Sequence, residues 1–388
     1  MKCEWKECVL SDVADIVDSL HKTPKYTEHG IPMLRVTDIK EGYLSLRSSV
    51  KVSLDIYDEF TKKHKPEIGD IVISRVGTYG VFSYVNTDER FCLGQNTAII
   101  IPHINTKYLY YFLMSPMVKK YLSSVVTGST QKTISLKNIK TIPLHIPSDV
   151  IQKRIANILS ALDDKIECNN KINENLQQQA QAIYENMFTG FRTSQVELSN
   201  IIDVRDGTHN SPKAENEGYP LITSKHLLPF SVDRASANRI SKDDFEKINE
   251  RSLVETQDIL MSMIGTIGLI SYVSYPVVDF AIKNVALFKT SHSPEFAYYI
   301  LCYLKSNATK QYIEKHLAGS TQKYISLREL RKMPVYQPSN TELEKFNFLV
   351  KPMFEDIVLR VNENIYLSEI RNTLLPKLMN GEIDIDGI

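Results

Sequence analysis

The sequence predicts an α+β protein: two mixed α/β globular domains joined by two long antiparallel coiled-coil helices, related by a pseudo-two-fold internal duplication. GSTQKTISLKNIKTIPLHIPS, which begins at Gly128, returns 191 residues later as GSTQKYISLRELRKMPVYQPS, with eleven of twenty-one positions identical. GDIVISRVGTYGVFSYV from Gly69 returns as QDILMSMIGTIGLISYV from Gln257, with nine of seventeen identical. Residues 150–188, finally, contain neither glycine nor proline. The repeated segments lie about 190 residues apart. Because this spacing far exceeds the roughly 20 to 50 residues of solenoid repeats, each copy is predicted to be a domain.

The globular part of each copy consists of short runs typical of strands. IVIS, FSYV and TAIII in the first copy are rich in β-branched and aromatic residues and are separated by glycine and proline turns. YLYYFLMSPMVKKYL, residues 108–122, has the apolar content of a helix. These patterns predict mixed α/β domains at residues 1–148 and 191–339.

Residues 149–190 and 340–388 are predicted to be helical regions that form a coiled coil, because apolar and amide residues recur in steps of four and three, which is heptad spacing. The first seam is Ile155, Leu159, Leu162, Ile166, Asn169, Asn173, Leu176, Ala180, Ile183 and Met187. The second is Phe346, Val350, Met353, Ile357, Arg360, Asn364, Leu367, Arg371, Leu374 and Leu378. Gly190 and Gly381 are placed to end the helices, whereas Pro352 and Pro376 predict a less regular second helix.

The order domain, helix, domain, helix constrains how the helices pair. A helix of about 38 residues spans roughly 57 Å, so the first helix carries the chain far from the first domain. The second helix must run back to bury its seam against the first. The polar residues at the middle of both seams are expected to fix the register at some cost in stability. A single chain thus imitates a symmetric dimer, which suits a DNA duplex with two half-sites about one turn apart.

Composition limits the class of protein. A chain of 388 residues with 43% hydrophobic residues can bury a sizeable core, and 46 basic residues balance 46 acidic ones. The charged start MKCEWKECVL and the absence of a long apolar run predict a soluble cytoplasmic protein with no membrane contact. The five cysteines are scattered without C-x-x-C spacing, so no zinc or redox site is expected.

The motifs of an enzyme are missing from the sequence. There is no Asn-Pro-Pro-aromatic tetrapeptide, no Gly-Lys dipeptide of a Walker A loop, no Pro-Asp dipeptide and no H-E-x-x-H among the nine histidines. We interpret Asp163, Asp164 and Glu167 as a solvated helix face. We therefore expect a chain that is not an enzyme and that holds no metal or cofactor.

Four features resemble one family, the specificity subunits of type I restriction-modification systems. They are the opening WKECVLSDVADI, the GSTQK loop that leads to a Pro-x-x-x-Pro segment in each half, the terminal NTLLPKLMNGEI, and the order of segments over nearly the whole chain. The resemblance implies two target recognition domains that each read half of a bipartite site in double-stranded DNA. It implies that the helices act as a ruler and dock two methyltransferase (M) subunits, with a restriction (R) subunit joining to make the endonuclease. S-adenosylmethionine, ATP and Mg²⁺ would then belong to the partner subunits.

The two GSTQK loops are the first candidates for DNA contact, because their hydroxyl, amide and ammonium groups suit phosphates and base edges. The alternative is a turn that leads into a short helix capped by Ser135 or Ser326. The candidate residues are Ser129, Thr130, Gln131 and Lys132, and Ser320, Thr321, Gln322 and Lys323.

The duplication sorts the other candidates. Polar residues shared by both halves suit scaffold or phosphate contacts, and these are His21 and His209, Lys25 and Lys213, and Thr78 and Thr266. Residues that differ are candidates to read different bases, since Arg suits guanine and Gln or Asn suits adenine. The differing pairs are Lys22 and Asn210, Arg35 and Thr223, Arg75 and Met263, Tyr79 and Ile267, Gln95 and Lys283, and Thr133 and Tyr324. Drift at positions that touch nothing explains such differences equally well.

A scaffold is the competing hypothesis. Long heptad helices with a neutral net charge would also suit a coiled-coil protein that binds partners without reading DNA, because a neutral chain gains little from counterion release. On the DNA hypothesis, the methyltransferase partners supply much of the nonspecific grip.

Overall fold

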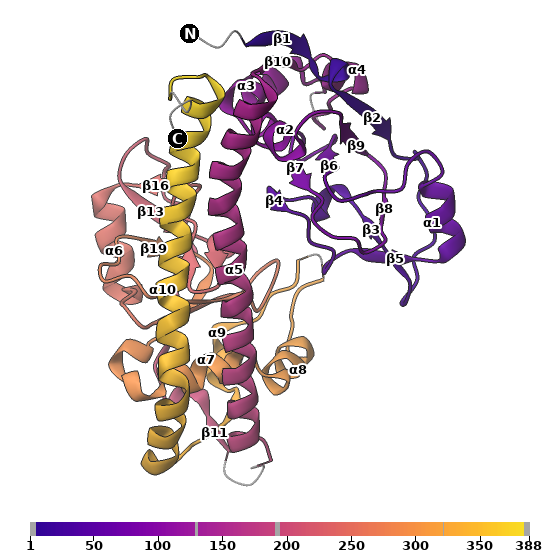
Figure 1. The fold of residues 1–388 in the computed structure, drawn as a ribbon. Helices are drawn as coiled ribbons and strands as arrows, with labels where there is room; N and C mark the ends of the chain where they lie inside the picture. Colours follow the sequence, from indigo (N-terminus) through magenta and orange to yellow (C-terminus); the bar gives the residue numbers. More distant parts are fainter. Residues whose placement is uncertain (1–4, 129–130, 191–194, 321, 384–388) are drawn as a thin grey trace. The chain divides into compact units, whose positions relative to one another are not determined.

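The computed structural model describes residues 5–128, 131–190, 195–320 and 322–383. Its contacts divide the chain into two compact units, unit 1 (Met1–Ile166 with Tyr366–Ile388) and unit 2 (Glu167–Ile365). Figure 1 follows the chain from indigo at the N-terminus to yellow at the C-terminus. Each unit contains a globular copy of the repeat and part of both long helices, so the contact-based units cut across the helices. Among the described residues, no helix is long and apolar enough to cross a membrane.

Unit 1 contains three small sheets. The five-stranded sheet has the order β2 (Ala14–Asp18), β9 (Thr97–Pro102), β6 (Ile71–Ser74), β7 (Phe82–Tyr84) and β4 (Gly42–Tyr43). The others are β5 (Val50–Val52), β3 (Ile31–Leu34) and β8 (Cys92–Leu93), and the pair β1 (Lys6–Val9) and β10 (Pro143–Ile146). Its helices are α1 (Leu54–Phe60), α2 (Thr106–Leu113), α3 (Pro116–Val125) and α4 (Leu136–Lys140), with 3-10 turns η1 (Leu10–Asp12) and η2 (Val36–Asp38).

Strand β6 lies between two layers of the core. Ile71 and Ile73 belong to the cluster that contains Tyr108 of α2, whereas Val72 belongs to a second cluster with Leu34. Alternate side chains of a strand point to opposite faces, so a strand covered on both sides is apolar throughout. This accounts for the run IVIS, all four residues of which are buried.

The expectation of one helix over residues 108–122 is wrong. The chain forms α2 and α3, separated by Met114 and Ser115. Ser115 is the N-cap of α3 and Pro116 occupies its first turn. Proline suits a first helical turn but lacks the N–H that an interior position donates, so Pro116 with the Ser115 N-cap favours the start of a new helix here.

Unit 2 repeats the arrangement of unit 1. Its sheets are β12 (Val204–Asp206), β20 (Val285–Phe288), β17 (Ile259–Ser262) and β18 (Ile270–Tyr272); β16 (Arg239–Ile240), β13 (Tyr219–Ile222) and β19 (Ala281–Ile282); β14 (Leu227–Leu228) and β15 (Ser231–Val232); and β11 (Gln195–Glu197) and β21 (Pro334–Tyr336). Its helices are α6 (Lys242–Ser252), α7 (Ala297–Lys305), α8 (Asn307–Lys315) and α9 (Leu327–Arg331), with 3-10 turns η3 (Leu198–Asn200), η4 (Ser224–His226), η5 (Thr290–His292) and η6 (Pro294–Phe296). The parallel pair β13 and β19 corresponds to β3 and β8.

Two helices of 40 residues each, α5 (Asp149–Phe188) and α10 (Asn340–Met379), follow the globular copies. Figure 1 shows α5 in magenta and α10 in yellow. The two prolines that were expected to make the second helix less regular do not interrupt it: α10 continues through both Pro352 and Pro376. Beyond the helix ends, Gly190 and Gly381 have φ angles of +118° and +68°, a region of backbone conformation that glycine adopts readily.

In unit 1, the start of α5 packs with the end of α10. Ile155 and Leu159 share a buried cluster with Leu375 and Leu378. Asp163 is buried beside them: its carboxylate accepts hydrogen bonds from the Tyr111 hydroxyl (2.7 Å) and the Arg371 Nη1 (2.6 Å). The interpretation of this carboxylate as solvated is therefore wrong, because two groups distant in sequence enclose it.

In unit 2, the remaining parts of the two helices pair in opposite directions. Asn169 Nδ2 donates to Asn364 Oδ1 at 2.8 Å, and the ring of Phe188 lies 5.3 Å from that of Phe346. Near the end of α5, Tyr184 and Phe188 are buried, one position beyond the predicted seam residues. They turn inward because Tyr299 of α7 packs against both rings.

The predicted seam residues of the two helices fall into a buried group and a half-buried group. The buried members are Ile155, Leu159, Asn169, Asn173, Ala180, Phe346, Val350, Ile357 and Leu378. The half-buried members are Leu162, Ile166, Leu176, Ile183, Met187, Met353, Arg360, Asn364, Leu367, Arg371 and Leu374.

Candidate nucleic-acid interface

Several loops of unit 1 meet through backbone hydrogen bonds at one end of β6 and β9. The N–H of Arg75 donates to Asn96 O (2.9 Å), and the N–H of Ile134 donates to Arg75 O (2.9 Å). The N–H of Gly77 donates to Lys132 O at 2.9 Å. The GTYG turn and the first GSTQK loop, the two most strongly repeated segments, are thus joined in space.

The residues that flank the two GSTQK loops form the same pair of backbone hydrogen bonds. Thr127 and Thr133 exchange backbone hydrogen bonds (3.0 and 2.8 Å), and Ala318 and Tyr324 do the same (2.9 Å each). Gly128 has φ +99°, and a Cβ there would lie 2.3 Å from the Gln131 carbonyl oxygen. A side chain at this position is therefore excluded by both strain and contact.

The residues after each loop begin a capped helix, as the alternative interpretation of this segment requires. Ser135 Oγ accepts from the N–H of Asn138 (3.1 Å), and Ser326 Oγ accepts from the N–H of Glu329 (3.2 Å). Both N-cap predictions are confirmed. Within the loops the exposed candidates are Gln131, Lys132, Ser320, Gln322 and Lys323, whereas Ser129, Thr130 and Thr321 lie outside the described residues.

On the DNA hypothesis, Gly128→Val is expected to open the first loop and to weaken the base preferences of the first domain, because the new side chain collides with Gln131. Gly319→Val is the matched change, since its Cβ would lie 2.3 Å from Gln322 O at φ +92°. Sequencing of DNA bound by each variant should show one block of bases weakened per variant. Loss of both blocks in either variant would contradict this assignment.

A partly buried ion pair anchors the loops of unit 1. The guanidinium of Arg75 pairs with Asp18 and also donates through Nε to Ile134 O at 3.2 Å. Only 11% of the Arg75 side chain is exposed. Asp18 also binds Nε2 of His21 (3.0 Å), whose ring is well exposed. The geometry thus gives Arg75 a positioning role, and it presents His21 at the surface.

Unit 2 keeps the same aspartate and histidine with a different cation. Asp206 binds His209 Nε2 (3.0 Å) and pairs with Arg251 of α6, while His209 Nδ1 contacts Asn284 Oδ1 at 2.8 Å. Met263, which replaces Arg75 in the repeat, is buried. The partner of the aspartate therefore changes between the halves, but the oriented histidine does not.

Three predicted base readers of unit 1 line one pocket: Lys22, Arg35 and Gln95. Lys22 Nζ donates to both carboxylate oxygens of Glu59 (2.8 and 3.0 Å), which balances its charge. With its side-chain amide turned so that the oxygen faces the two donors, Gln95 Oε1 accepts from the N–H of Lys22 (2.9 Å) and of Thr23 (3.1 Å). An adenine contact needs both ends of a Gln amide, so this geometry favours a role for Gln95 in holding the loop.

The corresponding residues of unit 2 hold their loop by other means. Lys283 Nζ donates to Ser211 Oγ at 2.5 Å, and the N–H of Thr223 donates to His226 Nδ1 at 3.0 Å. Burial lowers the pKa of His226, which favours the neutral ring that can accept this bond. The remaining candidates have exposed or half-buried side chains, namely Lys25, Thr78, Tyr79, Thr133, Asn210, Lys213, Thr266 and Tyr324.

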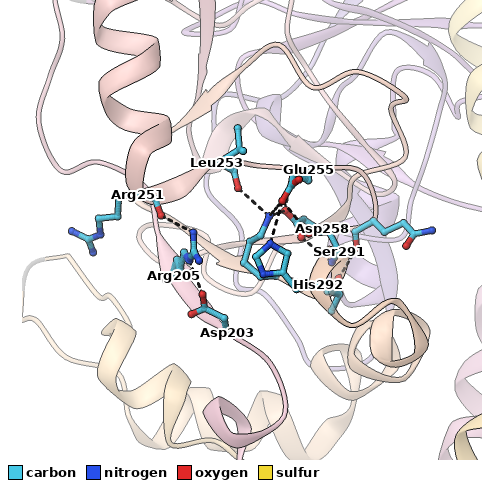
Figure 2. A network of polar contacts seen from close by, with 11 residues as sticks. Asp203, Arg205, Arg251, Leu253, Glu255, Asp258, Ser291 and His292 are labelled. Atoms are coloured by element: carbon cyan, nitrogen blue, oxygen red, sulfur yellow. Dashed lines mark hydrogen bonds and ion pairs between the residues drawn. The ribbon is translucent and has the colours of Figure 1, made fainter.

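The opposite end of the unit 2 strands carries a buried charge network, drawn in Figure 2. Lys289 Nζ donates to Leu253 O (3.1 Å), Glu255 Oε2 (2.7 Å) and Asp258 Oδ2 (2.7 Å). In unit 1 the corresponding Asp70 is bound by His64 Nε2 at 2.7 Å. The network joins the segment before β17 to the residue after β20, at the end of these strands opposite to the repeated loops.

Comparison with known proteins places this geometry in a family. The model of the type I restriction modification DNA specificity domain matches residues 2–178 and 194–345, one match for each copy of the repeat. The chain belongs to this family.

Its relatives are themselves specificity subunits of type I restriction enzymes. The chain is 26% identical to the MjaIX specificity subunit of Methanocaldococcus jannaschii, over 99% of this chain and 95% of that one. It is 23% identical to the HindI specificity subunit of Haemophilus influenzae, over 98% and 100%. The crystal structure of the type I S subunit from M. genitalium covers 97% of this chain and 96% of its own, with a TM-score of 0.52 at 16% identity, so it supports the fold. This protein is therefore a type I DNA specificity subunit.

Several residues that hold the loops and strands of this specificity subunit were not identified from the sequence. Asp18 and Asp206 stand at equivalent places three residues before His21 and His209, so the duplication itself held the signal for these pairs. Asp38 stands three residues after Arg35, the spacing of a capping box. No local signal identified Arg251 or Lys289, because their partners lie 45 and 31 residues away.

Proposed function

We propose that this specificity subunit reads a bipartite, asymmetric DNA site, with one half-site bound by each globular domain. The single observation that supports this is the recurrence, in both units, of a GSTQK loop, a GTxG turn and an aspartate-oriented histidine. Because the same framework carries different side chains, such as Arg35 and Thr223, the two half-sites should differ in sequence.

The long helices have the second role in this proposal. Paired as an antiparallel coiled coil with a pseudo-two-fold relation, α5 and α10 set the unread gap and dock two methyltransferase subunits and a restriction subunit. The chain itself performs no chemistry. S-adenosylmethionine, ATP and Mg²⁺ are bound by those partners, which also supply much of the nonspecific grip on DNA.

Selection from a random duplex library by the chain, co-purified with its methyltransferase partner, tests the proposal. Sequencing should reveal two short blocks at a constant gap, with centres about ten base pairs apart. One enriched block would mean that one domain is idle. No enrichment with the partner bound would favour the competing hypothesis of a coiled-coil scaffold without DNA readout.

Insertion of four residues into α5 tests the spacing role of the helix separately from base recognition by the globular domains. Four residues add about 6 Å of helix, so the gap should lengthen while both blocks keep their bases. Exchange of residues 1–148 for another recognition domain is the complementary change, and it should alter one block only. An insertion that changed the bases of either block would contradict the role of α5 as a spacer.

A further inference from the structure

The side chain of Arg35 is held in a fixed orientation by a buried carboxylate. Arg35 Nε donates to Asp38 Oδ2 (3.0 Å) and Nη2 donates to Asp38 Oδ1 (3.1 Å). The backbone N–H of Arg35 donates to the same Oδ2 at 2.9 Å. The Asp38 side chain is 4% exposed, whereas that of Arg35 is 43% exposed. A buried anchor therefore aims a guanidinium at the surface, and these hydrogen bonds raise its pKa above the usual range.

The edge of the guanidinium that remains available has the geometry of a base reader. Arg has five N–H donors in a planar fork, and Asp38 occupies the edge formed by Nε and Nη2. Within the described part of the chain, no acceptor contacts Nη1 of Arg35. The edge formed by Nη1 and Nη2 thus keeps two parallel donors, which match the O6 and N7 acceptors of guanine in the major groove.

The surroundings of Arg35 favour an acceptor-rich ligand. The pocket also contains Lys22, Gln95 and the half-exposed ring of Tyr26. Because Glu59 balances Lys22 and the Gln95 oxygen is bonded once its amide is turned toward Lys22, the side-chain NH2 of Gln95 and the free edge of Arg35 are donors left to face a base edge. Asn96, which lines the same pocket, accepts the backbone bond from Arg75 that leads on to the first GSTQK loop.

The second copy of the repeat shows which part of this arrangement is scaffold. Thr223 and His226 replace Arg35 and Asp38, and the N–H of Thr223 donates to His226 Nδ1 at 3.0 Å. The turn is kept, but the guanidinium and its carboxylate are both gone. Paired replacement of a charge and its anchor is expected where the two act together.

We propose that Arg35, positioned by Asp38, reads a guanine in the half-site bound by the first globular domain. This inference rests on the proposed function, because it assigns one base of the bipartite site to one side chain. Unit 2 has no equivalent reader at Thr223, so the guanine belongs to one block only.

The test compares variants of the full chain, each co-purified with the methyltransferase and used in the same library selection. Arg35→Thr, which installs the residue of the second copy, should reduce the preference for guanine at one position of one block by roughly 5- to 150-fold. Arg35→Lys keeps the charge but lacks the planar fork, so it should reduce this preference, though by less than Arg35→Thr. Asp38→Asn should reduce it less. Lys120→Gln, at an exposed position of α3, is the control and should leave both blocks unchanged.

The outcomes distinguish this inference from the function on which it rests. If the wild type selects two blocks and Arg35→Thr and Arg35→Lys keep every base preference, the assignment of Arg35 is wrong while the bipartite reading stands. If both variants weaken all positions equally, Arg35 contacts a phosphate and the inference also fails. If the wild type selects no blocks, the proposed function fails and the inference fails with it. Thermal melting of each variant confirms that the chain is folded.

Discussion

Replacement of Lys289 with methionine is expected to lower the free energy of unfolding of unit 2 by about 3 to 5 kcal/mol. The side chains of Lys289 and Asp258 are 1% and 0% exposed, and their charged atoms lie 2.7 Å apart. Removal of the ammonium leaves the Asp258 carboxylate buried without its counter-charge, which costs far more than loss of a surface pair. Hydrogen exchange at the amides of β17 and β20 measures the loss, and unit 1 provides the internal reference.

Lys242→Met is the matched control for this change. Lys242 and Glu246 form a pair at 3.5 Å in which both side chains are well exposed, so its loss should cost less than about 0.5 kcal/mol. An equal effect of the two substitutions would contradict the importance of burial.

Acid should act on the same network. Lys289 holds the pKa of Glu255 below its ordinary value of 4.5. A depressed folded-state pKa contributes stability that is present above pH 4.5 and is lost as the pH falls through the folded-state value. The free energy of unfolding of unit 2 should therefore fall less steeply with decreasing pH in Lys289→Met than in the wild type.

Asp163→Leu is expected to destabilise unit 1 by about 3 kcal/mol. The substitution leaves the buried hydroxyl of Tyr111 and the partly buried guanidinium of Arg371 without the acceptor that now binds both. Because Arg371 belongs to α10 and Asp163 to α5, the end of α10 should exchange its amides faster. Chemical denaturation measures the loss of stability, and hydrogen exchange at the amides of residues 366–379 measures the local effect on α10.

The neighbouring carboxylate provides the control. The Asp164 side chain is 55% exposed, and its Oδ2 lies 3.5 Å from Lys107 Nζ. Asp164→Leu also removes a contact with the Tyr43 hydroxyl. It should nevertheless lower the free energy of unfolding by less than Asp163→Leu does. A larger loss from Asp164→Leu would show that the contact between the helices in unit 1 does not depend on Asp163.

Much of the fold could be predicted because its signals are local or repeated. The absence of glycine and proline over residues 150–188 predicted α5, which the structure places at Asp149–Phe188. The serine before each short helix predicted both N-caps. Such features depend on neighbours within one or two helical turns, so a short stretch of sequence is enough to predict them.

The candidate site could be predicted only in part. The sequence identified Arg35, Arg75 and Gln95 as residues that differ between the copies, but it did not distinguish base readers from residues that hold the structure. In the structure, Arg75 is buried against Asp18, Gln95 holds a loop, and Arg35 keeps a free edge. These roles depend on which distant groups satisfy each donor, because a buried polar group must find its partner wherever the fold provides one.

The sequence by itself determined the duplication, the two long helices, the capped loops and the family. The tertiary structure alone decided which polar side chains are anchors and which face the surface. Asp163 and Lys289 show the reason: Asp163 lies in a predicted helix and Lys289 directly follows β20, but the burial of each depends on partners from 31 to 208 residues away. Secondary structure follows from short-range periodicity, whereas the environment of a charge follows from packing between segments that are distant in the chain.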